Sequence, residues 1–216
     1  MDIASYIDHT ILRPDCTTGD IKKICAEAMA HHFCSVCIPS FYVREAYRLL
    51  EDTPVKVGTV VGFPMGYSPT AAKVEEIKRA IDEGVDELDV VISICAVKDK
   101  KWNYLRNDIY TMTTAAHLKA KTIKVIIETG LLSEEEITKV CELCLEIQPD
   151  FLKTSTGFNG EGASLYSVRL LHQLVGSQIK IKASGGIRDR ETALQMIEAG
   201  AKRIGTSSGV KLLSGQ

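Results

Sequence analysis

The chain of 216 residues carries 26 basic and 28 acidic side chains, and neither sign forms a long block. This balance argues against nucleic acid and anionic membrane surfaces as partners. The N-terminal residues lack a basic segment followed by an apolar stretch, and no apolar run approaches the roughly 18 residues of a membrane-spanning helix, so we expect a soluble, cytoplasmic protein.

Short apolar segments alternate with amphipathic segments along the whole chain. The apolar segments predict eight strands, at Ile7–Thr10, Ser35–Pro39, Val55–Gly62, Glu87–Ser93, Thr122–Glu128, Phe151–Thr156, Ile179–Ser184 and Arg203–Ser207. The helices predicted between them include Thr70–Glu83 and Ser133–Ile147. The second of these begins with a capping box, in which Glu136 follows Ser133 by three residues.

Strands that alternate with helices form a parallel sheet covered by helices. Eight such units in 216 residues match a compact (β/α)8 barrel, the TIM barrel. No linker, low-complexity stretch or change of composition divides the chain. We therefore expect one α/β domain over residues 1–216.

The seven cysteines are an odd number spread over the chain, which argues against a disulfide framework. Two pairs, Cys34 with Cys37 and Cys141 with Cys144, have a spacing that four-thiolate zinc sites also use. The first pair lies in a predicted strand, where alternation directs its members to opposite faces, and the second lies on an amphipathic helix. We expect free thiols and no metal.

One lysine interrupts the apolar, β-branched run of the sixth predicted strand. Lys153 must be paired, face a cavity or be held neutral, because ionised lysine is rarely fully buried. Lys182 repeats the pattern in the seventh predicted strand, so the two face each other if these strands are neighbours. A second ammonium favours the neutral, nucleophilic amine that forms Schiff bases. The alternative is that both stems run along the sheet with their charged ends in water.

Polar side chains gather near the ends of the predicted strands, where the active site of such a barrel lies. They are Asp8, Thr10, Cys37, Asp89, Glu128, Lys153, Lys182, Ser207 and Ser208. Asp89 shares one strand face with Val91, so it interrupts an apolar strand and needs a cationic or hydrogen-bonding partner. A lysine across the barrel would keep it ionised, and the pair could move a proton through a bound water. A purely structural salt bridge is the alternative for Asp89.

Two glycine-containing loops indicate a phosphate site. Ser184-Gly185-Gly186-Ile187-Arg188 follows the seventh predicted strand, and Gly205-Thr206-Ser207-Ser208-Gly209 follows the eighth. In barrels of this type these two loops commonly offer backbone N–H groups to a phosphate. Ordinary turn glycines are the alternative for either loop alone.

Over essentially its whole length the chain resembles the deoxyribose-phosphate aldolases, a family of class I aldolases. Seven motifs in order carry the resemblance: Tyr6-Ile7-Asp8-His9-Thr10, Val61-Gly62-Phe63-Pro64, Glu87-Leu88-Asp89-Val90-Val91, Lys124-Val125-Ile126-Ile127-Glu128-Thr129, Phe151-Leu152-Lys153-Thr154-Ser155-Thr156-Gly157, Lys182-Ala183-Ser184-Gly185-Gly186-Ile187-Arg188 and Arg203-Ile204-Gly205-Thr206-Ser207.

The resemblance implies reversible cleavage of 2-deoxy-D-ribose 5-phosphate into acetaldehyde and D-glyceraldehyde 3-phosphate, without a metal or an organic cofactor. It implies that Lys153 forms the imine and that Asp89 and Lys182 transfer protons. The phosphate is then expected against Gly157, Gly185, Gly186, Ser207 and Ser208, and the sugar hydroxyls near Asp8, Thr10 and Cys37. We also expect a homo-oligomer, either a dimer or a tetramer.

Two positions depart from the family pattern. Phe158 stands where some members have a lysine near the phosphate, which implies weaker phosphate binding. The chain carries no tyrosine after Tyr166 and ends in Ser214-Gly215-Gln216, so we expect a tail that takes no part in proton transfer. Two other functions fit the residues: a Schiff-base aldolase for another sugar phosphate, and a non-catalytic barrel in which the two lysines only neutralise a bound phosphosugar.

Overall fold

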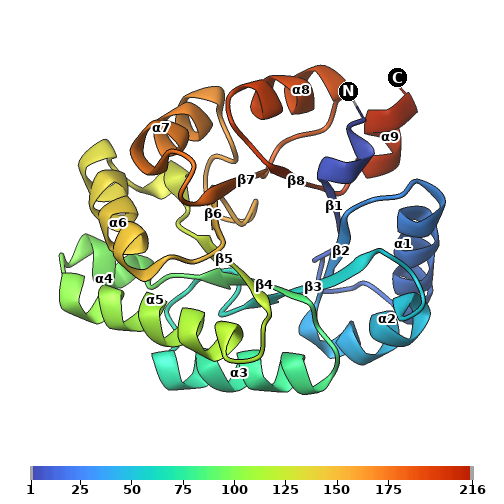
Figure 1. Ribbon diagram of the computed structural model, residues 1–216, viewed down its shortest axis with the longest axis horizontal. Coiled ribbons are helices and arrows are strands. Elements are labelled where there is room, and N and C mark those ends of the chain that lie inside the picture. The colour runs from blue at the N-terminus through green and yellow to red at the C-terminus, as the bar shows by residue number, and fades with distance from the viewer. Residues whose placement is uncertain (1, 215–216) are drawn as a thin grey trace.

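Eight parallel strands close into a barrel in the computed structural model, which describes residues 2–214 (Figure 1). Each strand pairs with the next along the chain, and β8 pairs with β1. The strands are β1 Ile7–Thr10, β2 Ser35–Ile38, β3 Lys56–Val61, β4 Glu87–Val91, β5 Thr122–Ile126, β6 Phe151–Lys153, β7 Lys180–Ser184 and β8 Arg203–Thr206. The expected (β/α)8 barrel is confirmed. The expectation about the C-terminal tail concerns Gly215 and Gln216, which lie outside the described residues.

Helices form a ring around the strands, as Figure 1 shows. They are α1 Thr18–Ala30, α2 Val43–Leu50, α3 Thr70–Asp82, α4 Ile94–Lys98, α5 Trp102–His117, α6 Glu134–Ile147, α7 Leu165–Val175, α8 Arg190–Glu198 and α9 Gly209–Ser214. Three 3-10 turns join them, at Ala4–Tyr6, Ser40–Tyr42 and Thr129–Leu131. The capping box of Ser133 and Glu136 at the start of α6 is confirmed.

The strands bury two faces of different character. In β4, Leu88 and Val90 alternate with Glu87 and Asp89, and all four side chains are buried. The two apolar side chains belong to the core cluster shared with the helices, while the two carboxylates meet cations from strands across the barrel. The barrel interior is therefore ionic and the layer between strands and helices is apolar.

The strand ends differ from the sequence prediction at one place that matters for the site. The sixth strand was predicted to reach Thr156 but ends at Lys153. The backbone N–H of Thr156 donates to the carboxylate of Glu128 at 3.0 Å, so a side chain takes the place of a strand partner. Thr154 still bonds its backbone to Lys182 and Thr129, and the chain leaves the sheet after it.

One buried ion pair lies outside the barrel, between α3 and α5. The ammonium of Lys73 donates to the Asp108 carboxylate at 2.9 Å and to the carbonyl of Val91 at 2.9 Å. Thr70 donates to the other oxygen of Asp108 at 2.7 Å. Each oxygen of this carboxylate thus accepts a hydrogen bond from α3, and Lys73 also reaches the end of β4, so the pair fastens α3 and α5 to that strand.

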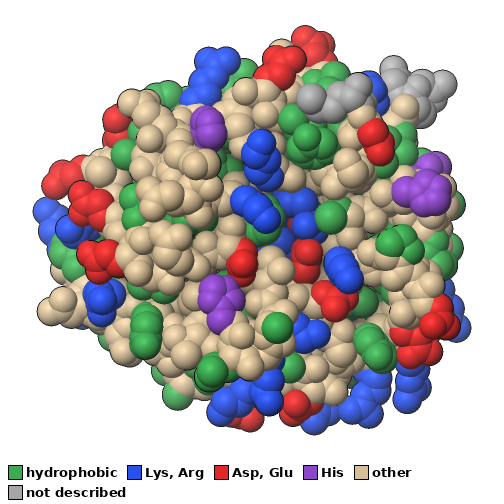
Figure 2. All heavy atoms as spheres, viewed as in Figure 1, with side chains coloured by type: hydrophobic (Ala, Val, Ile, Leu, Met, Phe, Trp, Pro, Cys, Tyr) green, Lys and Arg blue, Asp and Glu red, His purple; other side chains and the backbone are tan. Residues whose placement is uncertain are grey.

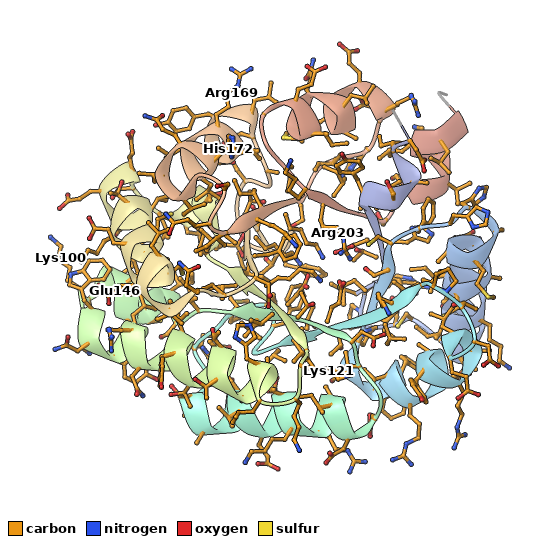
Figure 3. The ribbon with its side chains drawn as sticks, in the orientation of Figure 1. Lys100, Lys121, Glu146, Arg169, His172 and Arg203 are labelled. Carbon is orange, nitrogen blue, oxygen red and sulfur yellow. The ribbon has the colours of Figure 1, made fainter. Side chains whose placement is uncertain are left out.

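Charged side chains also occupy the molecular surface along the barrel axis. Figure 2 shows Lys, Arg, Asp and Glu side chains gathered at the centre of the face viewed there, with hydrophobic side chains scattered around them. In Figure 3 Arg203 lies inside the ring of helices, whereas Lys100, Glu146 and Arg169 lie at its periphery. Arg203 is buried despite its charge, so it must be paired within the barrel.

Candidate active site

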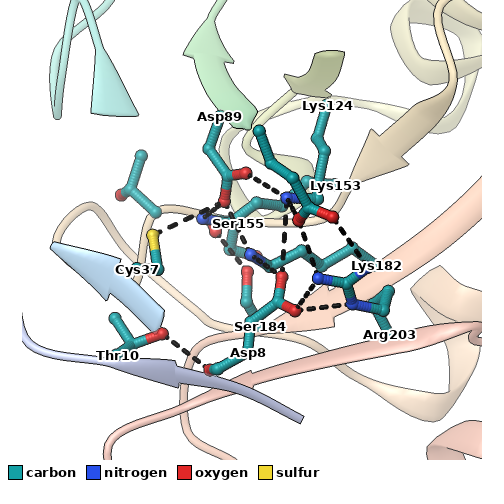
Figure 4. Close-up of polar contacts among 12 residues, drawn as sticks. Asp8, Thr10, Cys37, Asp89, Lys124, Lys153, Ser155, Lys182, Ser184 and Arg203 are labelled. Carbon is teal, nitrogen blue, oxygen red and sulfur yellow. Dashed lines mark hydrogen bonds and ion pairs between the residues drawn. The ribbon is translucent and has the colours of Figure 1, made fainter. Parts of the chain in front are cut away.

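Lys153 and Lys182 lie side by side, because β6 pairs with β7 in a register that places them opposite each other. Both are buried, with only 3% and 1% of their surface exposed. Their side-chain nitrogens both donate to one oxygen, Oδ2 of Asp89, at 2.8 and 2.7 Å (Figure 4). Asp89 reaches them from β4, across the barrel axis. The expected juxtaposition of the two lysines is confirmed.

A third lysine holds the other oxygen of Asp89. Lys124 of β5 is the register partner of Asp89, and its ammonium donates to Oδ1 at 3.0 Å. It also donates to Glu87 at 2.6 Å and lies 3.6 Å from the carboxylate of Asp8. Asp89 therefore receives donors on both oxygens, which fixes the plane of its carboxylate.

Arg203 closes the network at the start of β8. Its guanidinium donates to both oxygens of Glu87, at 3.2 and 2.7 Å, to Asp8 at 2.5 Å, and to the hydroxyl of Ser35 at 3.1 Å. Asp8 also lies 2.5 Å from the ammonium of Lys182. We call the connected set of buried charged side chains the ion cluster; its members are Asp8, Glu87, Asp89, Lys124, Lys153, Lys182 and Arg203.

The ion cluster fixes the protonation of most of its members. Burial alone would raise the pKa of Asp89, but Lys124, Lys153 and Lys182 outweigh it and hold that pKa well below its usual range. Burial likewise opposes the charge of Lys182, yet Asp8 and Asp89 raise its pKa above the usual value. Asp89 is thus an obligatory hydrogen-bond acceptor and Lys182 an ammonium donor over the ordinary pH range.

Gly205 of β8 makes room for Lys182. A Cβ atom at this position would stand 3.0 Å from Cε of Lys182 and 2.9 Å from Cβ of Ser184. Both contacts are closer than carbon atoms tolerate, and Lys182 is held at its far end by two carboxylates. The glycine at position 205 is therefore required by the side-chain packing of the site.

A pocket of about 500 Å³ opens at the carboxyl ends of the strands, directly above Lys153. Six of the predicted residues line it, namely Thr10, Lys153, Gly157, Gly185, Gly186 and Ser207. The other predicted residues lie beside or beneath its wall: Asp8, Cys37, Asp89, Lys182 and Ser208. Lys153 is the member of the ion cluster that belongs to the described wall of the pocket, so its nitrogen is the one that a ligand reaches first.

Three of the residues expected to contact substrate have other partners. Asp8 is buried in the ion cluster, where Lys182 and Arg203 bind its carboxylate. Cys37 is buried and donates weakly to Asp89 Oδ2 at 3.9 Å; burial and that carboxylate raise the pKa of its thiol, so it stays neutral. The backbone N–H of Ser208 donates to the hydroxyl of Thr206 at 2.9 Å. Their contacts with substrate stay predictions.

The glycine loops expected to bind phosphate come together at one side of the pocket. Gly157, Gly185 and Gly186 have φ angles of +81°, +89° and +80°, a region that favours glycine. A Cβ on Gly157 would stand 3.5 Å from the Cα of Gly185, so the loops after β6 and β7 touch. No described atom lies within 4 Å of a Cβ built on Gly186, so this backbone is open to the pocket.

Glu128 holds the loop after β6 in place. Its two carboxylate oxygens accept the backbone N–H of Thr156 at 3.0 Å and its hydroxyl at 2.6 Å. Glu128 is buried and has a left-handed backbone, with φ of +56°. Asn159 extends the arrangement by donating to the carbonyl of Pro64 at 2.9 Å, and Phe158 meets Phe63 edge to face with ring centres 5.2 Å apart. These contacts carry Gly157 to its position beside Gly185.

The remaining residues with metal-ligating side chains do not converge. The described part of the chain contains no group of three or more His, Cys, Asp and Glu side chains arranged to hold a metal ion. The seven cysteines are free, with Cys141 and Cys144 buried on α6 and Cys37 in β2. In the same described residues, none of the helices has the length and apolar character needed to cross a membrane.

Comparison with known proteins places this site in a family. Residues 3–215 match the model of the DeoC/LacD family aldolases. The chain belongs to this family. Among the relatives, a deoxyribose-phosphate aldolase from Thermococcus kodakarensis is 51% identical over 216 residues, which cover 99% of this chain and 96% of the relative.

Solved structures agree with the family and the fold. A putative deoxyribose-phosphate aldolase from Coccidioides immitis is 41% identical, with a TM-score of 0.95 over 99% of this chain and 85% of that one. The tetrameric deoxyribose phosphate aldolase from Aeropyrum pernix is 31% identical, with a TM-score of 0.92 over 98% of this chain and 89% of that one. Both likenesses extend over nearly the whole barrel described here.

Proposed function

We propose that this protein is a class I aldolase that reversibly cleaves 2-deoxy-D-ribose 5-phosphate into acetaldehyde and D-glyceraldehyde 3-phosphate. The observation that carries the proposal is the placement of Lys153 and Lys182 on one oxygen of Asp89, with Lys153 in the wall of the pocket. The relatives named deoxyribose-phosphate aldolase support the choice of substrate.

Lys153 is the proposed nucleophile. In its neutral form its nitrogen attacks the aldehyde carbon C1 of the open-chain sugar, and the carbonyl oxygen takes up a proton to give a carbinolamine. A proton delivered to the carbinolamine hydroxyl lets it depart as water, which leaves a protonated imine at C1. This cation is an electron sink next to C2, which is what cleavage of the C2–C3 bond requires.

Proton transfer is the proposed work of Lys182 and Asp89. As the C2–C3 bond breaks, its electrons move to C2 and form an enamine on Lys153. A bound water takes the proton of the C3 hydroxyl, and C3 becomes the aldehyde of glyceraldehyde 3-phosphate. A proton delivered to C2 and hydrolysis of the imine then release acetaldehyde. Lys182 is the ammonium that supplies this proton, and Asp89 holds both nitrogens in position by accepting from each.

Phosphate binding is proposed at the glycine loops, on Gly157, Gly185, Gly186, Ser207 and Ser208. Backbone N–H groups at such loops attract phosphate, and open space beside Gly186 lets the oxygens approach. A phosphate held there orients C1 over Lys153, so remote binding energy contributes to the rate. Phe158, which lines the pocket and is half exposed, offers an aromatic ring and no charge here, and we expect modest phosphate affinity.

The proposal extends to the whole chain. Residues 1–216 form a single catalytic domain that acts in the cytoplasm and needs no metal or organic cofactor. A homo-oligomer, a dimer or a tetramer, is proposed because the relative from Aeropyrum pernix is tetrameric. Sedimentation equilibrium of the purified protein distinguishes these two assemblies from a monomer.

The decisive experiment is incubation with 2-deoxy-D-ribose 5-phosphate and measurement of acetaldehyde through NADH consumption by alcohol dehydrogenase. We expect cleavage by the natural chain and essentially none by Lys153→Arg, since guanidinium does not act as a nucleophile. Cleavage of a different sugar phosphate instead would favour another aldolase. Binding without cleavage, and without borohydride trapping of acetaldehyde, would favour a phosphosugar-binding barrel.

A further inference from the structure

The charges of the ion cluster do not balance. Four of its side chains are cationic when protonated, and three are carboxylates: the cations are Lys124, Lys153, Lys182 and Arg203, and the carboxylates are Asp8, Glu87 and Asp89. Full ionisation therefore leaves one unmatched positive charge in a buried volume. Burial disfavours uncompensated charge, so the cluster is most stable when one cation has lost its proton.

The contacts identify which cation that is. Lys124 lies near three carboxylates and Lys182 near two, so each would forfeit several attractions on losing its charge. Arg203 keeps its proton in proteins at any working pH. Lys153 contacts one carboxylate, that of Asp89, and it alone among the described cations of the cluster lines the pocket, through which a proton can leave to water.

We propose that Lys124 and Glu87 are positioning residues that set the charge balance of the cluster and thereby the pH at which Lys153 becomes a nucleophile. The described lining of the pocket includes Lys153 but neither of these two residues, so they act through their neighbours and not on substrate. The inference rests on the proposed imine chemistry. It adds two residues that control the protonation of Lys153 without contacting substrate.

The two residues act with opposite signs. Lys124 adds a positive charge next to Asp89, and without it the ammonium form of Lys153 is less repelled and Asp89 Oδ1 loses its donor. Glu87 adds a negative charge to the cluster and forms ion pairs with Lys124 and Arg203. Without that carboxylate the positive excess grows, so Lys153 loses its proton more readily.

Other titratable groups face the cluster from the strands around it, and none of those described changes this reasoning. β1 contributes Asp8, β2 contributes the neutral thiol of Cys37, β4 contributes Glu87 and Asp89, and β5 to β8 contribute the three lysines and Arg203. Cys34, directly before β2, also faces the cluster, but burial raises the pKa of its thiol and it stays neutral. The charged side chain of β3 is Lys56, which is exposed. The balance is therefore decided within the seven members.

The test is the pH dependence of imine formation with acetaldehyde, trapped by borohydride and measured as the modified fraction by intact-protein mass spectrometry. The midpoint is the pH at which half of the maximal imine formation is reached. Relative to the natural chain, Lys124→Met should raise this pH by about one unit and Glu87→Gln should lower it by about one unit. Loss of packing or of folded protein changes the amplitude but cannot move the two midpoints in opposite directions.

Two matched variants serve as controls. Lys124→Arg keeps the charge and should return the midpoint to that of the natural chain, whereas Lys73→Met removes an equally buried ammonium whose partner Asp108 lies outside the cluster and should leave the midpoint unchanged. Midpoints that both stay in place, or that both move in the same direction, would overturn the inference. Failure of the natural chain to trap acetaldehyde would instead contradict the proposed function.

Discussion

Lys153 and Lys182 share a single oxygen atom, Oδ2 of Asp89, at 2.8 and 2.7 Å. Because the two lysines are register partners on adjacent strands, neither nitrogen can move away from the other without breaking its contact with the carboxylate. The arrangement places the ammonium of Lys182, whose pKa its carboxylate neighbours raise, beside the amine that faces the pocket. A proton donor and a nucleophile are thus held within reach of one another before substrate arrives.

The first prediction concerns the site of the imine. Treatment with acetaldehyde and borohydride should modify one peptide, which contains Lys153, because this lysine lines the pocket while Lys182 lies beneath it. Peptide mapping by mass spectrometry identifies the modified residue. Modification of Lys182 in place of Lys153 would reverse the two roles.

The second prediction concerns Asp89. Asp89→Asn should lower kcat by on the order of 100-fold or more, because a neutral amide lacks the negative charge that attracts both lysine nitrogens and stabilises the ammonium of Lys182. Steady-state kinetics with 2-deoxy-D-ribose 5-phosphate measure the loss, and far-UV circular dichroism checks that the barrel persists. A well-folded variant with nearly normal kcat would show that the carboxylate has only a structural role.

The third prediction concerns the phosphate site. Gly186→Ala should raise KM for 2-deoxy-D-ribose 5-phosphate much more than KM for unphosphorylated 2-deoxy-D-ribose, since the new methyl group enters the open space beside the loop. Gly176→Ala is the matched control, because Gly176 also has a positive φ and open surroundings but follows α7, away from the pocket. Equal losses for both sugars in Gly186→Ala would indicate a folding defect instead.

The fourth prediction is the pH range of stability. The pKa of Asp89 is depressed in the folded protein, so its contribution is present above its ordinary value of 3.8 and is lost as the pH falls below that value. The pKa of Lys182 is raised, so its contribution is present below its ordinary value of 10.5 and is lost as the pH rises beyond it. Urea unfolding should therefore show a constant contribution of Asp89 and Lys182 between these limits. The prediction would be contradicted if the unfolding free energy of the natural chain fell between pH 3.8 and pH 10.5 and the Asp89→Asn variant no longer showed that fall.

The sequence was sufficient to predict the barrel and the two lysines, because both depend on local patterns. Apolar segments that alternate with amphipathic segments predicted parallel strands covered by helices. A lysine in each of two apolar strands indicated a functional pair. The register of β6 and β7 then brought Lys153 and Lys182 together as expected. Glu128 was noted as a polar residue at a strand end, but its contact with Thr156 depends on loop geometry that the sequence does not reveal.

Three of the seven members of the ion cluster, Glu87, Lys124 and Arg203, were missed for a physical reason. Glu87 and Arg203 are the first residues of their strands. The site residues were predicted at the ends of strands, because that is where barrel active sites open to solvent. Lys124 carried the same signal as Lys153, a lysine in an apolar strand, but was not singled out. Which charges meet across a barrel depends on strand register and tilt around the whole ring, and these are not local properties of the chain.

The ionic interior of the barrel also limits how the enzyme can change during evolution. In many enzymes a catalytic polar group can be replaced by an apolar one with a gain in stability. Here removal of one charged member leaves its partners buried and unpaired, which typically costs about 3–5 kcal/mol. Replacement of Glu87 together with Lys124 by apolar residues of similar volume removes one charge of each sign and leaves the charge balance of the cluster unchanged. New activities on this barrel are therefore reached through coupled pairs of substitutions, and single steps within the ion cluster are selected against.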